Sequence, residues 1–376
     1  MSGYRRHLMA EIANRSFIEG YCNVYNSTFT FQLYLNGPNA GNKQQITVNT
    51  DTNGYWRYKL GQNKLYRLQE AFTSVSQAES DKLLSVRFNC DMSNLDSIYC
   101  MCYNTNSVHA ENLTSIIGIK FSESTYLNGY RYGFRETQVS QISLEGWKNS
   151  NAQNAQGMFN TCRSLTTIKT DATTSMKISN ANVMFRYCNS LENLDLSFSW
   201  VEFSQGANLS YAFGETYSLK SNPQDGIFDL SRFSFYGSLS NMFFTFSAEK
   251  TTWESQTGKT AWEYFTHIAL PTLLDGCDVT DAFIYLTQLE EITACGNIGA
   301  ITGALSFVNS PLSLNSAKLV LSKLQDLNGN SATITFSSAT LALVQASINN
   351  GDVDTISAVT NAIDNGWIIT GLDVIY

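Results

Sequence analysis

The stretch Met158-Phe159-Asn160-Thr161-Cys162-Arg163-Ser164-Leu165-Thr166-Thr167-Ile168 is the first clear copy of a unit that recurs along this chain of 376 residues. A second copy, from Met184 to Leu194, follows 26 residues later and matches the first in chemistry at six positions. Weaker copies begin at Ala212, Met242, Ala282 and Phe307, so the second position recurs after further steps of 28, 30, 40 and 25 residues. Gly133-Phe134 is a degraded candidate upstream.

A unit of this kind cannot bury its apolar face alone, whereas several stacked units bury a continuous one. We expect Met-Phe to open a short turn, Cys to occupy a small core position, and Ser-Leu-x-x-Ile to begin an extended segment. The phenylalanine rings should then stack along one buried edge. The pattern therefore predicts a strand-rich α+β chain whose central part, residues 63–311, is a leucine-rich-repeat-like solenoid.

The motif MFxxCxSLxxL resembles the repeat of the BspA-like leucine-rich-repeat family. The resemblance covers residues 130–314 best. It implies a binding or adhesion role, because that family is known mainly for surface-located binding proteins and not for catalysis.

Two different regions flank the repeats. Residues 17–62 are predicted to form a small β module, since 28–35 (TFTFQLYL) alternates polar and apolar residues and Asp51-Thr52-Asn53-Gly54 is a hairpin-turn signal. Its TDxNGxW segment resembles small bacterial immunoglobulin-like modules. Residues 312–376 are predicted to form a mixed α/β cap, and their expected elements are a helix capped at Asn315-Ser316 and ended by Gly329, a strand at 332–336, helices near 338–349 and 353–365, and a strand at 367–370.

The composition argues against several classes of function. Charged residues make up only 15% and the net charge is −8, which disfavours wide nucleic-acid contact. No apolar run reaches the length of a membrane span, and the N-terminus lacks the apolar core of an export signal. We find no zinc spacing, P-loop, nucleophile elbow or HExxH, so we expect no catalytic residue, cofactor or metal site.

The eight cysteines include Cys162 and Cys188 at one repeat position, and Cys100 and Cys102 as the one close pair. Small buried thiols in the core account for both patterns better than redox or metal chemistry does. Glu290-Glu291 is expected to be solvated repeat surface, since neighbours on a strand point to opposite faces.

Two segments are candidate binding sites. The 40-residue step holds an insertion, AEKTTWESQTGKTAWEYFTH, which contributes the aromatic residues Trp253, Trp262, Tyr264 and Phe265. Insertions in repeat proteins often form the binding face, although a packed helix or hairpin is the plainer interpretation. The arm at residues 1–16 carries an anchoring motif, whose members are Tyr4, Arg5, Arg6, Leu8 and Met9. It could dock on an acidic partner or be an ordinary tail.

The arm (YRRxLM), the β module, the repeats and the cap together resemble the layout of virion fibre or decoration proteins of tailed phages, the crAss-like group among them. The resemblance implies a non-enzymatic virion protein made in the host cytoplasm, anchored through its arm to capsid or tail proteins, homo-oligomeric, and binding a host surface protein or glycan. One alternative is a bacterial cell-surface adhesin. A second is a carbohydrate-active enzyme on a repeat scaffold.

Overall fold

The structure is a computed structural model that describes residues 16–73, 76–103, 106–121, 127–224 and 226–372. The chain divides into two compact units. The first runs to Ile178 and includes Trp200–Glu202. The second comprises Ser179–Ser199 and Phe203 onward.

The first unit begins with two sheets, of strand orders β4-β1-β6-β7 and β3-β2-β5. Their elements are β1 (Phe17–Cys22), β2 (Thr28–Leu35), η1 (Ala40–Asn42), β3 (Lys43–Asn49), β4 (Tyr55–Lys59), β5 (Leu65–Arg67), α2 (Gln77–Ser80), β6 (Leu83–Asn89) and β7 (Ser115–Ile117). The strand expected at 28–35 is confirmed as β2. Two of its buried rings, Phe29 and Phe31, contact Trp56 of β4, with centroids 5.5 and 5.2 Å apart, so the two sheets pack on each other.

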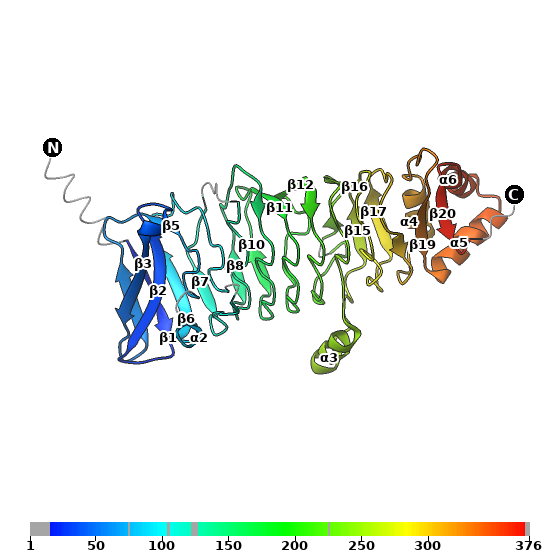
Figure 1. Cartoon of the computed structure of the whole chain (residues 1–376). Coiled ribbons are helices and arrows are strands. Elements are labelled where there is room, and N and C mark those ends of the chain that lie inside the picture. Colours follow the sequence, from blue (N-terminus) through cyan, green and yellow to red (C-terminus); the bar gives the residue numbers. More distant parts are fainter. Residues whose placement is uncertain (1–15, 74–75, 104–105, 122–126, 225, 373–376) are drawn as a thin grey trace. The chain divides into compact units, whose positions relative to one another are not determined.

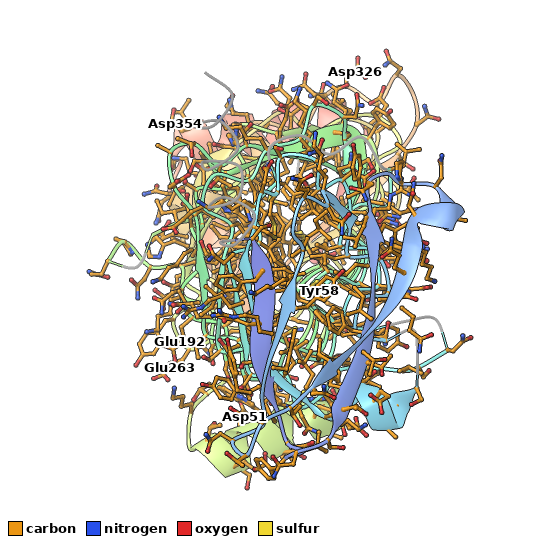
Figure 2. All side chains as sticks on the ribbon, turned by 90° about the vertical axis from the view of Figure 1, so that its left-hand side faces the viewer. Asp51, Tyr58, Glu192, Glu263, Asp326 and Asp354 are labelled. Atoms are coloured by element: carbon orange, nitrogen blue, oxygen red, sulfur yellow. The ribbon has the colours of Figure 1, made fainter. Side chains whose placement is uncertain are left out.

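The turn at Asp51–Gly54 is present, but it does not close a hairpin. β3 pairs with β2, and β4 pairs with β1, so the turn carries the chain from one sheet to the other. The Asp51 carboxylate accepts from the amides of Asn53 (2.7 Å) and Tyr55 (3.0 Å), and Gly54 has a φ of +78°. Figure 2 labels Asp51 at this turn. Local turn chemistry thus specified the turn, while packing of Trp56 specified the strand partners.

The solenoid prediction is wrong. In the described part of the chain the strands form small separate sheets, and no continuous sheet runs through the repeats. The first unit continues with β8 (Gln141–Ser143) and β10 (Thr167–Lys169), which pair only with each other. A separate sheet has the order β12-β11-β9 and contains β9 (Gln153–Asn154), β11 (Met176–Asn180) and β12 (Val201–Asn208); most of β12 belongs to the second unit. A leucine-rich-repeat solenoid needs one strand per repeat joined to the next. Here many strands are two or three residues long and turns fill most of each unit, so the ladders break.

The repeat motif instead marks a recurring turn with a buried aromatic ring. Phe159, Phe185, Phe213, Phe243 and Phe283 are all buried, as expected. In the second unit Phe213 stacks on Phe185 at 5.3 Å and on Phe243 at 5.9 Å. Backbone hydrogen bonds join equivalent turns, for example from the Phe213 amide to the Met242 carbonyl (2.9 Å). The repeat therefore predicted the core positions correctly and the sheet architecture incorrectly.

Aspartates shape several of the turns between the repeats. The Asp195 carboxylate accepts from the amide and hydroxyl of Ser197, and the Asp229 carboxylate accepts from the same two groups of Ser231. Such side-chain bonds to the residue two positions on compete with strand continuation. They help explain why β13 ends at Asp229.

The second unit has parallel sheets β13-β15-β17, β14-β16 and β18-β19-β20. Its elements are β13 (Phe228–Asp229), β14 (Ser234–Phe235), α3 (Ser247–Thr257), β15 (His267–Leu270), β16 (Thr272–Leu273), β17 (Glu291–Cys295), β18 (Leu305–Phe307), α4 (Leu314–Leu321), β19 (Ala332–Phe336), α5 (Ser338–Asn349), α6 (Val353–Asp364) and β20 (Trp367–Thr370).

The strands and helices expected from residue 332 onward are confirmed, but the first helix differs at both ends: its expected cap at Asn315-Ser316 and its expected end at Gly329 are wrong. Ser313, rather than Asn315-Ser316, caps α4: its hydroxyl accepts from the Ser316 amide at 3.2 Å. The helix ends at Leu321, so Leu324 and Leu327 are buried beyond it. Among the residues described, no helix combines the length and apolar character that crossing a membrane requires.

Candidate functional site

The insertion in the second unit contains α3, which stands apart from the neighbouring strands in Figure 1 and buries none of its residues. At its start, the Glu215 carboxylate accepts from the amide of Phe246 (2.8 Å), whose own side chain makes no cap. At its end, Gly258 adopts a left-handed φ of +68°. The Glu254 carboxylate then accepts from the Ala261 amide at 2.9 Å and holds the returning chain against the helix.

The four aromatic residues predicted in this segment divide into two pairs. Trp262 and Phe265 are fully buried and pack on Phe243, with centroids 5.8 and 5.1 Å apart. Trp253 is half-buried, and Tyr264 is 48% exposed. The first pair anchors the insertion, so only the second pair can meet a ligand.

Trp253 and Tyr264 line the same cavity, whose volume is about 300 Å³. The ring of Trp253 lies 5.2 Å from that of Tyr217, which is buried and whose hydroxyl is 2.9 Å from that of Thr245. The other lining residues are Glu192, Ser218, Leu219, Lys220, Lys259, Thr260 and Glu263. The volume is at the lower end of the range typical of ligand pockets, roughly 300–1,000 Å³.

The charged groups of this cleft largely neutralise each other. Glu192 forms ion pairs with Lys220 (3.6 Å) and Lys259 (3.5 Å). The Lys220 ammonium also lies 5.8 Å from the centre of the Tyr264 ring. Glu263 is exposed and forms no ion pair with the described residues; Figure 2 shows it beside Glu192 at the surface. Two lysines and two glutamates leave the lining with no net charge.

Sequence reasoning missed Glu192, Tyr217, Lys220 and Lys259. A signal for two of them was present: Glu192 and Lys220 both follow the leucine of their repeat, Leu191 and Leu219. Equivalent positions in successive units lie close together, so aligning the units would have paired this glutamate with this lysine. Nothing in the sequence indicated that α3 would carry Trp253 to the same place.

A larger groove, of about 960 Å³, lies in the first unit between the region of β7 and that of β8. The two aromatic residues that line this groove, Phe134 and Trp147, are buried in the core. The carboxylate of Asp171 accepts hydrogen bonds from the Gly146 amide and from the hydroxyls of Thr173 and Thr174. Those bonds hold the pKa of Asp171 down, at about 2. This groove offers a ligand fewer free side chains than the α3 cleft does.

The remaining candidates have structural roles or lie outside the described residues. Cys100, Cys102, Cys162 and Cys188 are buried, and desolvation raises the pKa of the Cys162 thiol to about 11. No cluster of metal-ligating side chains occurs in the described ranges. The Glu291 carboxylate accepts from the hydroxyls of Ser313 and Ser316, and Glu290 is exposed.

The anchoring motif, which consists of Tyr4, Arg5, Arg6, Leu8 and Met9, lies outside the residues that the structure describes.

The chain matches no protein-family model, no curated protein and no solved structure.

Proposed function

We propose that this protein is a non-enzymatic binding protein that recognises a molecule on a host cell surface through the α3 cleft. One observation carries the proposal: a segment anchored by two buried aromatic residues displays Trp253 and Tyr264 in a cavity with four charged side chains. Rigid aromatic rings with a few placed polar groups are what small-ligand sites typically present.

The narrower proposal is a phage virion fibre or decoration protein. It rests on the basic, partly apolar arm at residues 1–16 and on the resemblance of the layout to such proteins. Anchoring would occur at the arm, and binding would occur at α3 in the second unit. A bacterial surface adhesin remains the alternative, and the same cleft would serve it.

The binding proposal is tested with labelled purified protein on a panel of intact cells of diverse bacterial strains. We expect binding to some strains, and a loss of about tenfold or more in the Trp253→Ala/Tyr264→Ala double variant, because buried aromatic contacts dominate interface energies. Tyr236→Ala is the matched control, since Tyr236 is an exposed tyrosine of the same unit outside the cleft. Equal binding by the double variant and the wild type would refute the proposal.

The carbohydrate-active enzyme alternative has one observation in its favour, because Glu192 and Glu263 line one cleft. Glycosidases use two carboxyl groups, one of which acts as a proton donor. The carboxylate of Glu192 is already engaged by the ammonium groups of Lys220 and Lys259, which leaves it poorly placed to meet a glycosidic oxygen. Turnover of a bound glycan that disappears in Glu263→Gln would establish the enzyme instead.

A further inference from the structure

We infer that the ligand of the α3 cleft is an uncharged saccharide, held by ring stacking on Trp253 and Tyr264. This inference rests on the proposed function and names the chemistry of its ligand. It follows from three features of the cleft: which rings are accessible, how the charges are paired, and how small the cavity is.

The cleft exposes part of the side chains of Trp253 and Tyr264, with polar groups beside them. The ring of Trp253 packs against the buried ring of Tyr217, and this contact fixes the position of Trp253. The backbone of Tyr264 is fixed because its carbonyl accepts a hydrogen bond from the Ser221 amide at 2.8 Å. A pyranose ring carries C–H groups on its faces and hydroxyls around its edge. Such a ligand can place its faces on the aromatic residues and its hydroxyls on Thr260, Ser218 and the charged groups.

The pairing of charges disfavours an anionic sugar. Each lysine of the lining is already within ion-pair distance of Glu192, so an incoming carboxylate or sulfate would have to compete with that glutamate. It would also approach Glu263, an exposed carboxylate with no counter-ion among the described residues. The hydroxyls of a neutral sugar neither compete with Glu192 as a charged group nor are repelled by Glu263, because hydroxyls donate hydrogen bonds to carboxylates and accept them from ammonium groups.

The size of the cavity separates a saccharide from a protein ligand. A stable protein interface buries roughly 800 Å² on each partner, so a protein ligand would need contacts that extend well beyond this one cavity of about 300 Å³. A nucleobase could also stack on the two rings. Its phosphates would meet Glu263 and a chain of net charge −8, which makes nucleotides the poorer match.

The test is a glycan array followed by calorimetry on the full chain, with neutral, sialylated and uronic-acid oligosaccharides and with mononucleotides as probes. We expect binding confined to neutral oligosaccharides. Trp253→Ala and Tyr264→Ala should each weaken it about tenfold, and Tyr236→Ala should leave it unchanged. Glu263→Lys should bring acidic glycans into the bound set. Circular dichroism and melting curves would show that each variant is folded.

Two results would overturn the saccharide inference. One is binding confined to acidic glycans or nucleotides, and the other is no binding to any neutral oligosaccharide at millimolar concentration. If cell binding still depends on Trp253 in the second case, the proposed function stands and only the ligand class is wrong. If cell binding is also insensitive to Trp253, both proposals fail.

Discussion

Phe213 shows how a single repeat residue stabilises the second unit. Its buried ring contacts four other phenylalanine rings, with centroid distances of 5.3 Å to Phe185, 5.9 Å to Phe198, 5.0 Å to Phe228 and 5.9 Å to Phe243. The ring therefore joins two neighbouring repeat turns to the strand β13. Its removal would leave a cavity that several rings border.

We expect Phe213→Ala to lower the free energy of unfolding by about 3–5 kcal/mol, the usual cost of deleting a buried aromatic side chain. Tyr236→Ala, at a ring that is 55% exposed, should change it by less than about 0.5 kcal/mol. Urea titration followed by circular dichroism measures both. A cost near zero for Phe213→Ala would show that this ring is not part of the core.

Glu215 is a buried carboxylic acid beside the N-terminal end of α3. Burial raises its pKa to about 7, and the nearby Glu249 carboxylate adds to the rise; the Phe246 amide, Arg186 and Thr245 act in the opposite direction. The folded chain therefore keeps a proton on Glu215 at pH values where the unfolded chain, with a carboxyl pKa near 4.5, has lost it. Stability should fall as pH rises through this window.

We expect the wild type to lose on the order of 1–2 kcal/mol between about pH 5 and pH 8 relative to Glu215→Gln, a figure that allows for solvent screening. Glutamine keeps an acceptor for the Phe246 amide, so the comparison isolates the charge. Urea unfolding at a series of pH values gives the two curves. Parallel curves would mean that Glu215 ionises at the same pH in both states.

At the scale of elements, α3 differs from the other long helices of the second unit. It buries none of its eleven residues, whereas α6 buries Thr355, Ala358, Val359 and Ala362. Its ties to the body are Glu215 at its start, the Trp253–Tyr217 ring contact, and the ion pair of Lys259 with Glu192 just after its end. Helices with so little tertiary packing open locally at low free-energy cost.

We expect the amides of α3 to exchange with solvent at least about a hundredfold faster than those of α6, since the difference in opening free energy should exceed about 3 kcal/mol. Hydrogen exchange read by mass spectrometry resolves the two segments. Addition of a ligand that fits the cleft should slow exchange in α3 and leave α6 unchanged. Equal protection of the two helices in the free protein would contradict this view of α3.

At the scale of the whole molecule, the narrower proposal of a virion protein depends on the arm at residues 1–16. The chain carries a net charge of −8, while Arg5, Arg6 and Arg15 concentrate positive charge in this segment. Like-charged proteins repel, so one basic end suits docking on an acidic partner. Several copies docking together would add avidity, which is why we expect a homo-oligomer.

Deleting residues 2–16 should abolish incorporation into virus particles while the melting temperature and solubility stay within experimental error of the wild type. Particle purification followed by immunoblotting measures incorporation, and scanning calorimetry measures folding. Replacement of Arg5 and Arg6 by glutamate is the sharper variant, since it reverses the charge without shortening the chain. Normal incorporation of both variants would place the anchor elsewhere.

The sequence by itself determined the local features. Polar–apolar alternation predicted β2, the local pattern predicted the strands and helices from residue 332 onward, and the repeat predicted which phenylalanines are buried. These features depend on residues within a few positions of each other or on the burial preference of one side chain. The two anchoring aromatic residues of the insertion, Trp262 and Phe265, looked the same in sequence as the two that line the cleft.

Only the tertiary structure decided which strands pair and which side chains meet. The local sequence of the Asp51–Gly54 turn fits a hairpin and a connection between two sheets equally well. The packing of Trp56 on Phe29 and Phe31 decides that the turn connects two sheets. The repeat spacing was compatible with one continuous sheet, yet many strands are only two or three residues long and form small separate sheets. Likewise Glu192 and Lys259 are far apart in sequence and share an ion pair because α3 returns the chain to the repeats. Non-local pairing is set by packing free energy summed over many residues, which no local pattern contains.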